Sequence, residues 1–74
     1  MNIKIEENAV IRFYNEGKLF HTTDVAELKE ENRSWDYKMS VGDKLKIRHE
    51  KREIVSITYG NENHVEPEYR IGVK

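Results

Sequence analysis

The chain has 74 residues, no cysteine, and 13 basic against 14 acidic side chains, which gives a net charge of −1. This length predicts a single domain over residues 1–74 with a thin core, because a chain of this size buries only about 60% of its unfolded surface. The lack of cysteine excludes disulfides and thiolate sites. The balanced charge argues against a protein devoted to nucleic acid, since such domains carry a clear positive excess.

Alternation of apolar and polar residues predicts the first strands. We expect a short strand over residues 2–6, followed by a β-hairpin over residues 9–22. Asn, Glu and Gly at residues 15–17 are typical of a three-residue hairpin loop, with glycine in the left-handed position. This loop would place Leu19 opposite Phe13.

A short helix is predicted after this hairpin. Asp24 followed three residues later by Glu27 fits a capping box, so we expect about two turns of helix from Val25 to Glu31. Its outer face would be strongly acidic, through Glu27, Glu30 and Glu31. These carboxylates are either a solvated face or candidates for binding a protein.

Residues 34–39 alternate again, with Trp35, Tyr37 and Met39 on one side. The segment is either a fourth strand or a loop whose aromatic side chains fill the core. Trp35 either seals one end of the core or is exposed as an interface anchor, where Trp and Tyr are enriched. We therefore include Trp35 and Tyr37 among the protein-binding candidates.

Residues 41–59 predict a second hairpin, in which Val55, Ile57 and Tyr59 share the core face. A turn at residues 50–52 would place Ile47 opposite Val55 and leave Ile54 on the outer face.

Residues 44–52 contain five basic side chains and one acidic one, whereas residues 24–36 contain five acidic and two basic. The basic cluster makes the second hairpin the best nucleic-acid-binding candidate, with stacking surfaces expected from Tyr14, Phe20 or Tyr37. The alternative is a solvated strand face whose charge is neutralised by the acidic segment. The nucleic-acid candidates are Lys44, Lys46, Arg48, Lys51 and Arg52.

The last segment alternates through Tyr69, Ile71 and Val73, which predicts a final strand at an edge of the sheet. A polar loop with the only proline, over residues 60–67, precedes it.

No pattern of catalytic or metal-binding residues stands out. His21, His49 and His64 lack the spacing of metal ligands, and the four glycines are too scattered to form a phosphate-binding loop. We therefore expect no enzyme activity, no metal and no cofactor.

Together these elements predict an α+β, β-rich fold: a small antiparallel sheet or partly open barrel of five to six short strands, with one short helix near residues 24–32. The order of elements resembles the OB-fold, and the Val41-Gly42-Asp43 lead into a charged meander is similar to SH3-like barrels. Both resemblances concern topology and generic turns, and they imply no particular family.

The predicted function is that of a small non-enzymatic interaction module that binds another protein, as an adaptor or as an inhibitor of a larger host factor. Direct binding of nucleic acid through residues 44–52 is the alternative, and a homodimer joined at strand edges is a further one. The N-terminal residues lack the features of a secretion signal and no apolar run approaches a membrane span, so we expect a cytoplasmic location. Frequent Lys, Glu, Asn and Ile are typical of an AT-rich genome, which favours a bacterial or viral source, such as a phage or mobile element.

Overall fold

The computed structural model of the chain describes residues 2–60 and 66–74. Within this part the elements follow one another as β1 (Ile3–Lys4), β2 (Val10–Asn15), β3 (Lys18–Asp24), α1 (Val25–Glu31), β4 (Lys38–Met39), β5 (Lys44–Ile47), β6 (Glu50–Gly60) and β7 (Glu68–Val73). None of the described helices is long and apolar enough to cross a membrane.

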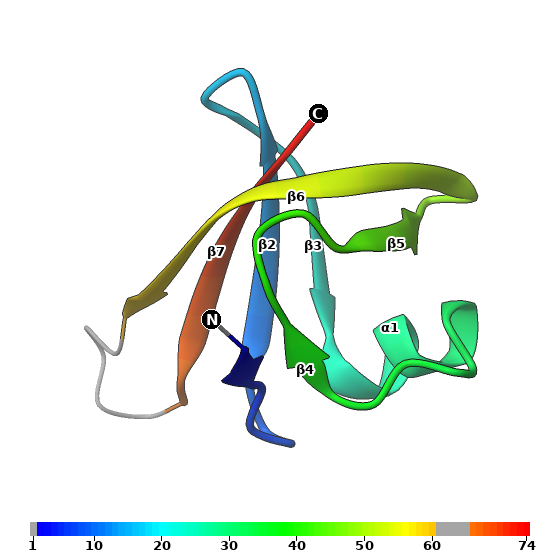
Figure 1. Cartoon of the computed structure of the whole chain (residues 1–74). Coiled ribbons are helices and arrows are strands. Elements are labelled where there is room, and N and C mark those ends of the chain that lie inside the picture. Colours follow the sequence, from blue (N-terminus) through cyan, green and yellow to red (C-terminus); the bar gives the residue numbers. More distant parts are fainter. Residues whose placement is uncertain (1, 61–65) are drawn as a thin grey trace.

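The strands form one curled sheet and one small ladder. The five-stranded sheet has the order β3-β2-β7-β6-β5, and β1 pairs with β4 in a two-stranded ladder. In Figure 1, β6 crosses β7 and β2 at a steep angle and carries β5 beneath it, which bends the sheet into a half-barrel. The predicted fold class, a small β-rich sheet or partly open barrel with one short helix, is confirmed.

One strand pair is parallel, in contrast to the expected antiparallel sheet. β7 pairs with β2 in parallel and with β6 in antiparallel orientation, so it is the central strand. The expectation that residues 69–73 form an edge strand is therefore wrong. The predicted alternation along this strand is confirmed, because Tyr69, Ile71 and Val73 are all buried. Alternation specifies which side chains face the core, but not which strands lie on either side.

Both hairpins turn over two residues rather than three. Glu16 and Gly17 have φ values of 52° and 79°, and Arg48 and His49 have φ values of 52° and 69°. Two successive left-handed residues are typical of the type I′ turn, whose twist matches that of the flanking strands. Leu19 consequently lies opposite Tyr14, not opposite Phe13, which pairs with His21.

The second hairpin departs further from the predicted register. Ile47 pairs with Glu50, so the expected turn at residues 50–52 is already part of β6. An irregularity in β6 between Ile54 and Ser56 then adds one residue to the strand. A bulge of this kind exchanges the faces of the residues on either side of it. Ile54 is buried and Val55 is 44% exposed, the reverse of the prediction.

The predicted helix is confirmed, and it spans Val25–Glu31 as expected. Asp24 is the N-cap, and its Oδ1 accepts a hydrogen bond from the backbone N–H of Glu27 at 2.8 Å. The Glu27 carboxylate accepts from the Thr23 hydroxyl at 3.0 Å. Val25 and Leu28 are buried, so this short helix is held by its packing against the sheet.

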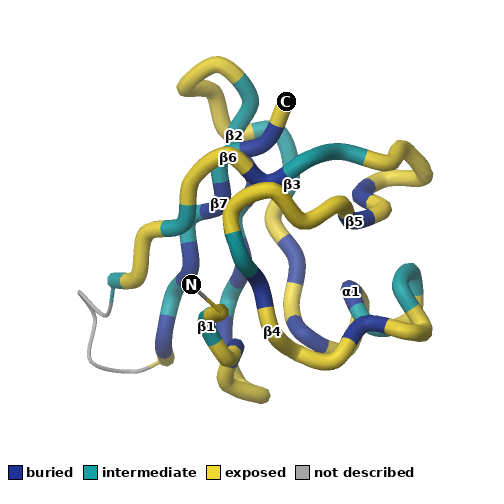
Figure 2. Tube along the Cα trace, in the orientation of Figure 1, coloured by how far each residue is buried: buried dark blue, intermediate teal, exposed yellow. Residues whose placement is uncertain are grey.

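The core lies between the concave side of the sheet, the β1–β4 ladder and the helix, and Figure 2 shows buried and exposed residues alternating along the strands. Residues 34–39 are mostly a loop, with strand only at Lys38–Met39. Trp35 is 7% exposed and its Nε1 donates to the carbonyl of Lys38 at 2.8 Å, so its ring seals the core. The buried hydrophobic residues are Ile5, Ala9, Ile11, Phe13, Val25, Leu28, Trp35, Met39, Leu45, Ile47, Ile54, Tyr69, Ile71 and Val73.

Candidate protein-interaction surface

The acidic segment does contact the basic hairpin, but it contacts the hairpin's main chain. The Asn32 side chain, just after the helix, accepts from the N–H of Lys46 at 2.7 Å and donates to its carbonyl at 2.9 Å. The Glu31 carboxylate accepts from the N–H of His49 at 2.7 Å. The helix therefore positions the hairpin, and none of these bonds uses a lysine ammonium.

The two arginines among the nucleic-acid candidates are directed away from the lysines. Arg48 lies in the turn, and its guanidinium donates to the carbonyl of Phe20 on β3 at 3.3 Å. Arg52 lies on the inner face of β6, where its guanidinium sits 4.8 Å from the centre of the Phe20 ring and bonds to Glu50 at 3.1 Å. Both side chains thus pack between β3 and the second hairpin. The predicted basic surface is thus smaller than the sequence indicated.

Lys44, Lys46 and Lys51 form what remains of that surface, and we refer to these three residues as the lysine face. They are exposed on the outer side of the β5–β6 hairpin, and Lys46 lies directly opposite Lys51 in the ladder. Among the described residues, none of the ion pairs includes any of these three.

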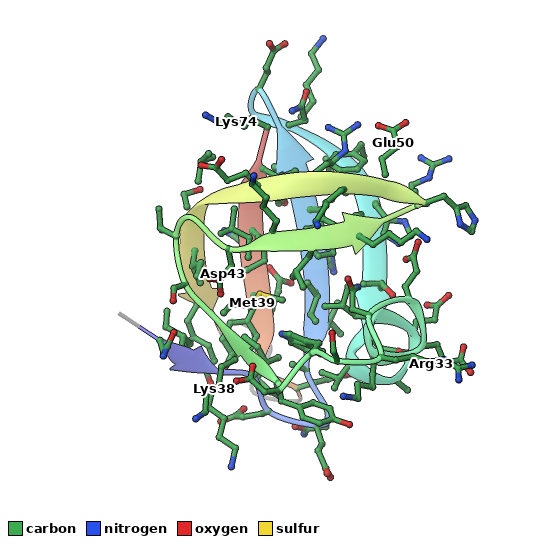
Figure 3. All side chains as sticks on the ribbon, turned by 45° about the vertical axis from the view of Figure 1, so that its right-hand side comes forward. Arg33, Lys38, Met39, Asp43, Glu50 and Lys74 are labelled. Atoms are coloured by element: carbon green, nitrogen blue, oxygen red, sulfur yellow. The ribbon has the colours of Figure 1, made fainter. Side chains whose placement is uncertain are left out.

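The acids beside the lysine face have other partners. Glu50 pairs with Arg52, and Glu53, which lies opposite Lys44 in the ladder, is 3.9 Å from the ammonium of Lys74. Figure 3 places Glu50 near the tip of the hairpin and Lys74 above β6 toward the other side of the molecule. The positive charge of the lysine face is therefore concentrated at Lys46 and Lys51, which face each other rather than an acid.

Two of the three acidic candidates on the helix accept hydrogen bonds from neighbouring elements of the fold. Glu27 accepts from Thr23, and Glu31 accepts from the turn of the second hairpin. Glu30 is exposed and borders, with these two, an open groove of about 550 Å³ between the helix and the hairpin tip. No group of three or more His, Asp or Glu residues in the described part of the chain is arranged to hold a metal ion.

The aromatic candidates divide between core and surface. Trp35 is buried, as the core interpretation of its role predicts. Tyr37 is 37% exposed and has a φ of 66°, and its ring packs 5.2 Å from that of Trp35. The ammonium of Lys29 lies 4.9 Å from the centre of the Tyr37 ring. Tyr37 is thus accessible to a partner, whereas Trp35 is not.

An apolar row on the outer face of the sheet was missed by the sequence reasoning. Leu19, Tyr14, Gly72 and Ser56 are successive partners across β3, β2, β7 and β6, and Val55 lies beside Gly72. Leu19 is 49% and Val55 44% exposed, and Tyr14 is half-buried. We call Leu19, Tyr14 and Val55 the apolar row.

Gly72 gives the row its shape. A Cβ at this position would lie 2.3 Å from the hydroxyl oxygen of Ser56, so a larger residue here would require the Ser56 side chain to rotate away. The missing side chain leaves a shallow depression of about 300 Å³ over the sheet. The available signal in the sequence was the adjacent pair Ile54-Val55, which interrupts strict alternation.

Tyr69 is a buried phenol at the end of β7 nearest to β1. Its hydroxyl donates to the carbonyl of Lys4 at 3.3 Å, and its ring packs edge-on against Tyr59, with the ring centres 5.0 Å apart. Burial, with smaller contributions from the charges of Glu6 and Tyr59, raises the pKa of Tyr69 above the usual value of 10.0. The phenol stays protonated at neutral pH and acts as a donor.

The geometry of these surfaces is the only guide to function. No protein-family model, curated protein or solved structure matches the chain.

Proposed function

We propose that the chain is a non-enzymatic interaction module that binds another protein through the outer face of its sheet. The observation that carries the proposal is the apolar row, whose three side chains come from β3, β2 and β6 and flank the depression over Gly72 on β7, on a face that no other described element covers. At roughly 4.8 Å per strand the row is about 14 Å long. Apolar side chains that are gathered on one face mark interaction sites more often than single exposed residues do.

The surroundings of the row support an interface with a protein. Arg12 and Arg70 lie on the same outer face, and both bond to Glu68, at 3.2 and 2.8 Å. A centre poor in charge beside a rim of paired charges is the usual anatomy of a protein–protein interface. The bulge in β6 adds to this, because bulges often redirect a side chain at functional sites and here one turns Val55 outward. A small module of this kind suits an adaptor or an inhibitor of a larger protein.

Comparative capture from cell lysate tests the proposal. We expect a protein partner that the native chain and Val41→Lys retain, and that Val55→Lys loses. Val41 is the matched control, since it is 62% exposed, lies in none of the strands that carry the row and receives the same charge. Because Gly42 beside it bonds to the carbonyl of Ile54 at 2.8 Å, a loss confined to Val55→Lys would place the contact on the row itself. Retention of the same partner by Val55→Lys would contradict the proposal, and so would recovery that disappears after nuclease treatment.

Binding of nucleic acid is the second candidate, favoured by the three exposed lysines of the lysine face, which form no ion pair with the described residues. The aromatic side chains that were expected to stack on bases do not support it. The Phe20 ring is covered by Arg52, Tyr37 packs beside Trp35, and Tyr14 lies on β2. The paired segments that carry the lysines, residues 44–47 and 50–53, hold no aromatic residue, so three lysines would supply only a weak, salt-sensitive attraction to phosphates.

A further inference from the structure

The lysine face keeps an unfavourable arrangement of charge. Lys46 and Lys51 are direct cross-strand partners, and like charges in this position destabilise a sheet. Of the acids closest to this pair in sequence, Glu50 bonds to Arg52, and Glu53 stands opposite Lys44, one position away, with the ammonium of Lys74 at 3.9 Å. Opposed lysines without a neutralising acid cost stability in the free protein. That cost is removed when a negatively charged partner lies between them.

The main chain beneath these lysines is held firmly in place. Asn32 bonds to both the N–H and the carbonyl of Lys46, and Glu31 bonds to the N–H of His49 in the turn. Arg48 fastens the same turn to β3 through the carbonyl of Phe20. A partner would therefore have to order only the lysine side chains, which lowers the entropic cost of binding.

The spacing of the lysines suits an extended chain. Lys44 and Lys46 are two residues apart on one strand, which separates their Cα atoms by roughly 6.6 Å, and Lys51 lies across from Lys46 at about 5 Å. An extended peptide presents every second side chain on one side with the same period of roughly 6.6 Å. Acidic residues at alternate positions would thus meet successive lysines.

We propose that the lysine face binds an acidic segment of the partner protein, in extended conformation and with carboxylates at alternate positions. This inference rests on the proposed function for the class of partner. It adds a second contact, charged and separate from the apolar row. A protein segment is favoured over nucleic acid because the chain has a net charge of −1 and the paired part of the hairpin, residues 44–47 and 50–53, carries no aromatic residue.

Peptide binding tests the proposal with defined probes. A labelled peptide of alternating Glu and Thr is titrated at low salt, beside a peptide of the same composition with its glutamates in one block and beside a single-stranded oligothymidine. We expect the alternating peptide to bind best. The Lys46→Glu/Lys51→Glu variant should weaken its binding by roughly tenfold, since two exposed attractions become repulsions.

The chain offers a matched control for this variant. Lys4 and Lys38 are also exposed and directly opposed, on the β1–β4 ladder, and Figure 3 shows Lys38 at the end of the molecule away from the hairpin. Lys4→Glu/Lys38→Glu makes the same change in net charge. It should alter peptide binding by less than about twofold. Equal weakening by both double variants would overturn the proposal, as would stronger binding of the oligonucleotide than of the alternating peptide.

The single variant Lys46→Glu adds a readout that general charge effects would not reproduce. It places opposite charges across the ladder, so we expect a higher melting temperature together with weaker peptide binding. A lower melting temperature would contradict the claim that the opposed lysines cost stability. Peptide binding that fails while Val55→Lys still abolishes partner capture would overturn the lysine contact alone. The converse result would overturn the apolar row alone.

Discussion

The side-chain amide of Asn32 pairs with the main chain of Lys46 as a neighbouring strand would. Its Oδ1 accepts from the Lys46 N–H at 2.7 Å, and its Nδ2 donates to the Lys46 carbonyl at 2.9 Å. The same Nδ2 also donates to the carbonyl of Leu28 at the end of the helix. One amide therefore joins the helix to β5 and covers part of an exposed sheet edge, where unpaired backbone groups otherwise invite association.

We expect Asn32→Ala to lower the free energy of unfolding by about 1–2 kcal/mol, because it removes two hydrogen bonds to β5 and one to the helix end. Asn32→Asp is the control. Its carboxylate still accepts from the Lys46 N–H, but it cannot donate to the carbonyls of Lys46 and Leu28. Urea denaturation should rank the native chain above Asn32→Asp, and Asn32→Asp above Asn32→Ala. An alanine variant as stable as the native chain would show that water replaces the amide at no cost.

The two hairpin turns predict opposite responses to substitution. Gly17 and His49 are equivalent second turn residues, with φ values of 79° and 69°. His49→Gly should stabilise the protein by about 0.5 kcal/mol, because glycine adopts this conformation without strain and the His49 side chain is 90% exposed. Gly17→Ala should cost about 1 kcal/mol. Thermal unfolding measures both, and a destabilising His49→Gly would mean that its contact with Glu31 outweighs the strain.

The bulge in β6 predicts a sharp contrast between adjacent residues. Ile54→Ala should destabilise the fold by about 2–5 kcal/mol, because Ile54 is fully buried in the core. Val55→Ala should change stability by no more than about 0.5 kcal/mol, since Val55 lies on the outer face. Chemical denaturation of the two variants is the measurement. Similar losses in both would mean that β6 runs without the bulge.

The burial of the Tyr69 phenol leads us to expect that the protein loses stability at alkaline pH. The pKa of this phenol is raised in the folded chain, chiefly by burial, so the unfolded chain ionises first as the pH rises. Stability linked to this group is complete below pH 10, the usual pKa of the phenol, and falls as the pH passes from that value through the raised one. We expect Tyr69→Phe to be less sensitive to pH above 10 than the native chain. Denaturant unfolding across this range measures the difference, and parallel curves would contradict the assignment.

The parts of the fold that were predictable are those set by neighbouring residues. Asp24 and Glu27 specify where the helix begins, because the cap bond joins residues three apart. The burial of Ile11, Phe13 and Ile71 follows from alternation along each strand. These interactions span a few residues, and their signals are read directly from the chain.

Apart from the length of the loop after Asn15, the wrong predictions concern features that depend on distant segments. The turn at Arg48-His49 lacks the Asn-Gly signature of its type, and its left-handed residues are held from outside by Glu31 and Phe20. The bulge at Val55 arises where β6 passes from its pairing with β5 to its pairing with β7. The apolar row and the division of the basic cluster both follow from these two features, which is why the candidate surface was predicted only in part.

The central position of β7 also determines how the chain must fold. The β2–β3 and β5–β6 hairpins can each form locally, but the main sheet is continuous only when Glu68–Val73 enters between β2 and β6. The β2–β7 pairing joins residues 58 positions apart, as from Val10 to Glu68. Contacts of such long range must overcome loop-closure entropy before they stabilise anything, so folding is expected on the millisecond-to-second scale of non-local β proteins. Stopped-flow refolding should show Ile71→Ala slowing the main phase if β7 docks at the rate-limiting step.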